Sequence, residues 1–85
     1  MPRVAETIRS SHNRDGAIVL DVRQGHMFSL NFVGSAILEL LKQGRGESEI
    51  ADTLAARFEI NRDIAEADVA EFIATLKRHG LVESI

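Results

Sequence analysis

Residues 15–44, DGAIVLDVRQGHMFSLNFVGSAILELLKQG, decide the fold of this 85-residue chain. Two short apolar runs flank a Gln-Gly pair, which favours a tight connection between two strands. The first run, 17–23, alternates with the period of a half-buried strand, and the second, 26–30, continues through Asn31 into a helical pattern. This order predicts a β-hairpin that is followed directly by a helix.

The second strand of this hairpin is the most informative element. Within residues 26–30 we expect Phe28 and Leu30 to point into the core, and Met27 and Ser29 to point outward. A strand at the end of a small sheet leaves a row of backbone N–H and C=O groups unpaired. That edge is therefore the predicted working surface of the protein.

The remaining segments complete the layout. A weaker alternating pattern over 4–11 predicts another strand, and the turn after it ends in an Asp-Gly pair, a strong turn signal. Apolar residues at helical spacing predict three helices over 32–43, 47–58 and 62–79. The expected fold is α+β and winged-helix-like, a three-stranded antiparallel sheet followed by a three-helix bundle (βββααα), in one domain of residues 1–85.

Residues at the helix ends support these boundaries. Asn31 is a good N-cap, since its side-chain oxygen can accept a hydrogen bond from an unpaired helix N–H. Gly44 and Gly80 stand where a left-handed residue commonly ends a helix. Beyond the last helix, Leu81 and Val82 are expected to fold back onto the core.

Composition excludes several classes of function. Ten basic and thirteen acidic side chains give a net charge of −3, whereas nucleic-acid-binding domains normally carry a basic excess. Cysteine is absent, which excludes disulfides and fits a reducing compartment. The N-terminus lacks the apolar core of a signal peptide, and no apolar run approaches the ~18 residues that cross a bilayer. We therefore expect a soluble cytoplasmic protein with neither a membrane nor a nucleic-acid partner.

The chemistry-bearing residues form no catalytic or metal-binding motif. The three histidines lie in a turn, a strand and a helix end without i, i+4 spacing, so no metal site is expected. Ser10 and His12 resemble a nucleophile and its base, but no acid stands nearby in sequence to orient the histidine. The acids of 63–71 predict a solvated helix face, although Asp68 borders the apolar stripe and can cap or pair locally. The sequence predicts no cofactor and no enzyme activity.

One set of residues forms a family pattern along essentially the whole chain. Its first part comprises Asp15, Gly16, Leu20, Asp21, Gly25, Phe28, Leu30, Asn31, Gly34, Leu40, Leu41, Gly44 and Arg45. Its second part comprises Ala67, Asp68, Val69, Phe72, Leu76, Gly80, Leu81 and Val82. With these residues the chain resembles the PqqD-like proteins, and the hairpin-to-helix segment is the most specific part. In two departures, Met27 stands where the family often has an aromatic residue, and Gly46 where Thr or Ser is common.

The resemblance implies a function. PqqD-like proteins are recognition elements for the leader peptides of ribosomally made, modified peptides, and are named for the chaperone of pyrroloquinoline quinone synthesis. In the family, the leader adds as an antiparallel strand to the third strand, and its apolar side chains enter the groove between that strand and the third helix. The resemblance brings no catalytic residues, and implies a maturation enzyme as partner, such as a radical S-adenosylmethionine protein, a protease or a cyclase. The implied peptide-binding residues are His26, Met27, Phe28, Ser29, Leu30, Val69, Phe72, Ile73, Leu76 and Lys77.

Two other interpretations remain open. The helices over 47–58 and 62–79 can be read as the helix-turn-helix of a winged-helix DNA-binding domain. Against it, the last helix begins with Asp63 and continues with further acids, which DNA would repel. The other alternative is a homodimer, in which the exposed strands over 26–30 pair across a twofold axis. Such a dimer would compete with leader binding for the same edge.

Overall fold

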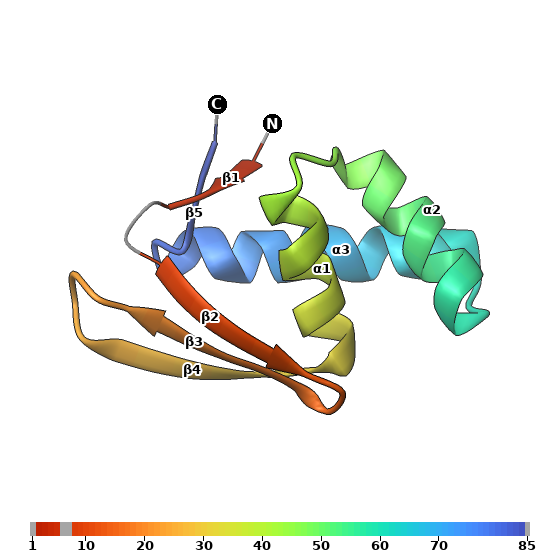
Figure 1. Ribbon diagram of the computed structural model, residues 1–85. Helices are drawn as coiled ribbons and strands as arrows, with labels where there is room; N and C mark the ends of the chain where they lie inside the picture. The colour runs from red at the N-terminus through yellow and green to blue at the C-terminus, as the bar shows by residue number, and fades with distance from the viewer. Residues whose placement is uncertain (1, 6–7, 85) are drawn as a thin grey trace.

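The computed structural model of the chain describes residues 2–5 and 8–84 (Figure 1). Three antiparallel strands followed by three helices form the main body, which confirms the predicted fold class. A short strand at either end of the chain is added to this body. In order, the elements are β1 (Pro2–Val4), β2 (Ile8–Asn13), β3 (Gly16–Asp21), β4 (His26–Asn31), α1 (Phe32–Lys42), α2 (Glu47–Phe58), α3 (Arg62–Arg78) and β5 (Val82–Ser84).

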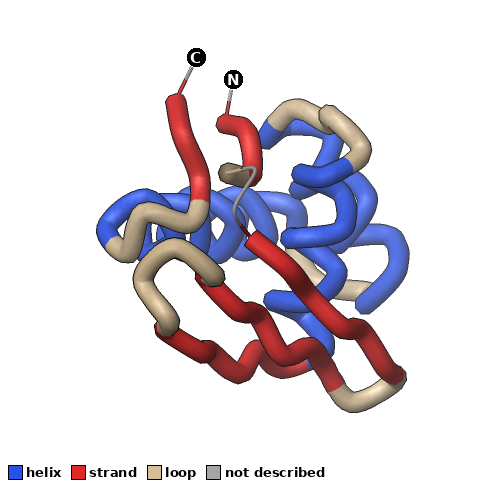
Figure 2. The backbone as a smooth tube through the Cα atoms, turned by 60° about the vertical axis from the view of Figure 1, so that its left-hand side comes forward, coloured by secondary structure: helices blue, strands red, loops and turns tan. Residues whose placement is uncertain are grey.

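The strands form two separate sheets. In the larger sheet, β3 lies in the centre and pairs antiparallel with β2 on one side and β4 on the other. In the smaller sheet, β1 pairs antiparallel with β5, so the two ends of the chain run side by side (Figures 1 and 2).

The predicted single strand over 4–11 is wrong. Val4 ends β1 and Ile8 begins β2, and the two strands pair with different partners; residues 6 and 7 lie outside the described part of the chain. The physical reason is the C-terminal segment, in which Leu81 and Val82 are buried, as expected. Their burial brings the segment that follows α3 alongside β1, which pairs with it and not with the larger sheet.

Strand β3 buries one face and exposes the other. Val19 and Asp21 are each 1% exposed, whereas Ile18 is 44% exposed on the opposite face. The register fixes this choice, because Val19 lies opposite Phe28 of β4, whose ring packs against the core. The sequence alternation alone does not decide which face is buried.

Strand β3 ends two residues earlier than predicted. The Asp21 side-chain Oδ1 accepts hydrogen bonds from the backbone N–H groups of Arg23 (3.1 Å) and Gln24 (3.3 Å), and the Asp21 carbonyl accepts one from Gly25 (2.7 Å). These bonds are typical of an aspartate that turns the chain. The connection to β4 is therefore a four-residue turn that begins at Val22 and ends at Gly25.

Helix α1 packs against the inner face of the larger sheet, and α2 and α3 pack against each other. Helix α1 crosses that face, and α3 runs behind α1 (Figure 1). Asn31 is the N-cap of α1, as predicted, since its Oδ1 accepts a hydrogen bond from the Gly34 N–H at 2.8 Å. Asn61 caps α3 in the same way through the Asp63 N–H at 2.8 Å. The largest fully buried apolar side chains are Ile37, Leu38, Ile50, Leu54, Ile73, Leu81, Val19 and Val69.

Gly16 is required by the close approach of two strands. It begins β3 with a φ of +152° and lies opposite Asn31 at the end of β4. A Cβ atom added at Gly16 would come within 1.9 Å of the Leu30 carbonyl oxygen. No side chain fits there, so this glycine fixes how closely the end of β4 lies against β3.

Candidate functional site

Strand β4 is an outer strand of the larger sheet. Among the described residues it pairs with β3 and with no other strand, and the N-terminal β1 pairs with β5 instead. Phe28 and Leu30 are half-buried and Met27 and Ser29 are exposed, as predicted. The backbone edge of β4 is therefore not taken by the described part of the N-terminal arm.

A cleft of about 480 Å³ opens beside β4, between this strand, the start of α1 and the middle of α3. Apolar side chains contribute much of its lining, and two carboxylates of α3 lie at its side. We call this hollow the edge cleft. Its lining consists of Ser29, Leu30, Asn31, Val33, Gly34, Ile37, Asp68, Glu71, Phe72 and Thr75.

Gly34 shapes the edge cleft from the first turn of α1. A Cβ atom at this position would come within 3.0 Å of Cε1 and 3.2 Å of Cζ of Phe72. The missing side chain therefore lets the Phe72 ring of α3 approach the backbone of α1. A glycine inside a helix is usually unfavourable by about 1 kcal/mol relative to alanine, and close packing is a common reason to keep it.

The predicted peptide-binding residues fall into three groups. Ser29, Leu30 and Phe72 line the edge cleft. Val69, Ile73 and Leu76 are core residues with at most 3% exposure, so they support the cleft from beneath. The exposed residues are His26, Met27 and Lys77, while Phe28 is half-buried.

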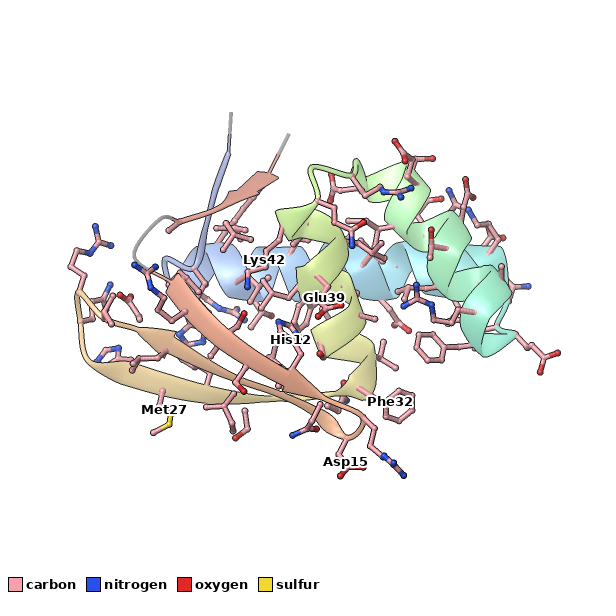
Figure 3. The ribbon with its side chains drawn as sticks, viewed as in Figure 1. His12, Asp15, Met27, Phe32, Glu39 and Lys42 are labelled. Atoms are coloured by element: carbon pink, nitrogen blue, oxygen red, sulfur yellow. The ribbon has the colours of Figure 1, made fainter. Side chains whose placement is uncertain are left out.

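Phe28 and Met27 lie on opposite faces of β4. The Phe28 ring contacts His79 at the end of α3, with 5.2 Å between ring centroids, and His26 at 6.3 Å. Met27 is 68% exposed and points away from the helices (Figure 3). Met27 therefore belongs to the outer face of the sheet and not to the edge cleft.

Apart from the cap residue Asn31, six residues that line the cleft were not among the predicted peptide-binding residues. Two of them, Gly34 and Asp68, belong to the family pattern, but the pattern alone does not show that they line a cleft. The others carried no local signal, because their role depends on how α1 and α3 meet. The six are Val33, Gly34, Ile37, Asp68, Glu71 and Thr75.

A polar cluster joins β2 to α1 on the inner face of the sheet. His12 Nδ1 lies 2.6 Å from the Ser35 hydroxyl and 3.4 Å from Glu39 Oε1, and His12 Nε2 lies 2.9 Å from the Ser10 hydroxyl. Lys42 Nζ donates to the same Ser10 hydroxyl (Figure 3). No acid stands near His12 in sequence, but the fold brings Glu39 of α1 beside it. The cluster lies outside the edge cleft, so we assign it a structural role.

The α2–α3 pair is held by a second polar cluster. Arg62 donates to Asp52 and, at 2.8 Å, to Glu66, while its other nitrogen reaches the Ser48 hydroxyl at 3.2 Å. The hydrogen bond with Asp52, followed by that with Glu66, raises the pKa of Arg62 above its ordinary value. Arg62 begins α3, where a DNA-binding domain would offer cations to phosphates, but its charge is already matched by two acids. This geometry does not favour DNA binding.

The described part of the chain has neither a cluster of metal ligands nor a membrane-spanning helix. No group of three or more potential metal ligands comes together there. No described helix is long and apolar enough to cross a membrane.

Fold and site together define a small α+β module with a sheet edge beside an apolar cleft. Residues 16–82 match the family of coenzyme PQQ synthesis protein D (PqqD), and the chain belongs to this family. Comparison with curated protein sequences gives no match.

Three solved structures are similar over nearly the whole chain. TbiB1 in complex with the TbiA(beta) leader peptide is 30% identical, with 98% of this chain and 96% of that chain covered and a TM-score of 0.90. Lasso peptide synthetase B1 complexed with its leader peptide is 28% identical, with 98% of each chain covered and a TM-score of 0.87. The PqqD truncation of Methylobacterium extorquens PqqCD, a stand-alone recognition element for ribosomally synthesised and modified peptides, is 25% identical. It covers 98% of this chain and 88% of its own, with a TM-score of 0.80.

Proposed function

We propose that this protein recognises the leader of a ribosomally made precursor peptide by β-strand addition to β4. The observation that carries the proposal is that β4 has an edge with which no described strand pairs, and that the edge cleft lies directly beside it. The complexes of TbiB1 and of lasso peptide synthetase B1 with leader peptides support it, because both proteins share this fold. Family membership supports the same function.

The geometry divides affinity and specificity between backbone and side chains. An added strand gains main-chain hydrogen bonds along β4, which has six residues and is about 20 Å long. Every second side chain of the guest would then point toward the edge cleft, where Leu30, Val33 and Phe72 offer apolar surface. Two or three such side chains and one strand are enough for micromolar binding, about −8 kcal/mol.

The remaining parts of the proposal concern the partner. We propose that the module itself is not catalytic and presents the precursor to a maturation enzyme in the cytoplasm, such as a radical S-adenosylmethionine protein, a protease or a cyclase. The synthetase and PqqCD neighbours support an enzyme partner without selecting a class. A homodimer through β4 would occupy the same edge, so peptide binding should dissociate it, which light scattering measures.

Amide chemical shifts test the proposal directly. The probe is the leader of the short peptide encoded nearest to the gene of this protein, titrated into the labelled chain. We expect shifts at residues 26–30 of β4 and along 64–78 of α3. Shifts confined to residues 47–62 would contradict the proposal, because none of these residues lines the edge cleft or pairs with β4.

A further inference from the structure

We infer that the edge cleft selects leaders by the order of their charges: a lysine or arginine before the apolar anchor residues and an aspartate or glutamate after them. The inference rests on the proposed function and names the class of peptide that this chain accepts. It follows from the acids that line one end of the cleft and the basic residues that lie beyond its other end.

One end of the edge cleft is acidic. Asp68 and Glu71, one helical turn apart on α3, line it near the Asn31 end of β4. Both are exposed, and within the described residues neither carboxylate has an ion pair or a side-chain hydrogen bond. The next acid toward the start of α3 differs, because the Glu66 carboxylate accepts a hydrogen bond from Arg62 at 2.8 Å. The two acids that line the cleft are thus not neutralised by an ion pair with a described cation.

The other end is basic. The Arg78 guanidinium donates a hydrogen bond at 3.1 Å to the hydroxyl of Thr75, which lines the cleft. Beyond it, the His79 and His26 rings flank Phe28 of β4. Arg78 and the two imidazoles therefore lie just beyond the lining of the cleft, and no acid lines the cleft between Thr75 and the start of β4.

The direction in which the guest strand runs along β4 decides the order of the charged residues in its sequence. Strand β4 runs from the basic end at His26 to the acidic end at Asn31. All pairs of the larger sheet are antiparallel, and antiparallel pairing is the more frequent and slightly more stable arrangement. An antiparallel guest enters at the acidic end and leaves at the basic end. Its cation therefore precedes its anion.

Helix geometry sets the spacing. From Glu71 to Arg78 the helix rises about 10 Å, and from Asp68 to His79 about 16 Å, at about 1.5 Å per residue. A strand covers these lengths in about three to five residues. The predicted guest therefore carries its cation and its anion about three to five residues apart, with apolar side chains between them. Each exposed pair should change affinity by about two- to fivefold.

A display library of random ten-residue peptides tests the inference. The library is sorted against the unmodified chain and against Glu71→Lys, with Glu59→Lys as the control. Glu59 is also exposed but lies at the end of α2, so both variants change the net charge equally. Circular dichroism checks that each variant is folded, and the isosteric Glu71→Gln replaces Glu71→Lys if that variant is not.

We expect peptides selected by the unmodified chain and by Glu59→Lys to carry Lys or Arg before the apolar residues and Asp or Glu after them. Glu71→Lys should lose or invert the preference before the apolar residues, and Glu71→Gln should weaken it. Selected peptides without a charge order, or with the opposite order, would overturn this inference and leave the proposed function standing. If no strand-forming peptide is enriched, the proposed function itself fails.

Discussion

Strands β2 and β4 are the two outer strands of one sheet, and they meet the helices differently. The inner face of β2 is tied to α1 by polar side chains, with His12 bonded to Ser35 and Lys42 to Ser10. The inner face of β4 instead borders the edge cleft, and its polar bond to α1 lies at the end of the strand, where Asn31 accepts from the Gly34 N–H at 2.8 Å. The inner face of β2 is thus braced by α1, whereas the inner face of β4 is left open beside the cleft. The difference indicates that α1 holds β2 in place through side-chain hydrogen bonds and forms one wall of the cleft beside β4.

The largest effect on this comparison is expected from Gly16→Ala, which changes the junction of β3 and β4. The new Cβ would overlap the Leu30 carbonyl oxygen, so the end of β4 must move. We expect a loss of about 3 kcal/mol or more in unfolding free energy, measured by urea denaturation. Gly25→Ala is the control: its φ is also positive, at +72°, but no atom lies within 4 Å of the added Cβ. It should lose only about 1–2 kcal/mol, and equal losses for the two variants would contradict the account.

His12→Ala removes the brace of β2. The change leaves the Ser35 and Ser10 hydroxyls without their imidazole partner, so we expect a loss of about 1–3 kcal/mol in unfolding free energy. Peptide affinity of the folded variant should stay within about twofold, since β4 is untouched. Ser11→Ala on the exposed face of the same strand should change stability by less than about 0.5 kcal/mol. A strong loss of affinity in His12→Ala would show that the two edges are not independent.

Gly34→Ala narrows the edge cleft with little effect on stability. The added methyl group displaces the Phe72 ring, while alanine gains about 1 kcal/mol of helix propensity, so the unfolding free energy should change by about 1 kcal/mol or less. We expect peptide affinity to fall about tenfold, equivalent to 1.4 kcal/mol, measured by isothermal titration calorimetry. Unchanged affinity would place the guest elsewhere.

Met27→Ser should have the smallest effect. Met27 is exposed on the outer face of β4 and does not line the edge cleft. We expect peptide affinity to change by less than about twofold and stability by less than about 0.5 kcal/mol. An affinity loss as large as that of Gly34→Ala would mean that the outer face, and not the cleft, holds the side chains of the guest.

Much of the fold could be predicted from the sequence, because its signals are local. The alternation of 26–30, the Asn31 cap and the glycine after α1 each act within a few residues, and all three appear in the structure. The break between β1 and β2 could not be predicted in the same way. It depends on β5, which lies almost eighty residues away in sequence and becomes the partner of β1.

The candidate site was predictable on the strand and less so on the helices. The exposed and half-buried positions of β4 follow from alternation. Helix α3 instead places apolar side chains both against the core and along the cleft, and the helical spacing in the sequence does not tell these two faces apart. Val69 and Ile73 face the core, and only Phe72 of the predicted α3 residues lines the cleft. Whether an acid such as Glu71 is merely solvated or faces a guest depends on how α3 crosses β4, which the sequence does not encode locally.

Hydrogen exchange of the β4 amides tests the central claim most directly. In an outer strand, alternate backbone N–H groups point away from the sheet and exchange fast, because they have no partner. On saturation with a leader peptide, we predict that these alternate amides within 26–31 become protected while the amides of β2 keep their rates. Fast exchange of all outward β4 amides in a complex that is otherwise saturated would contradict strand addition at this edge.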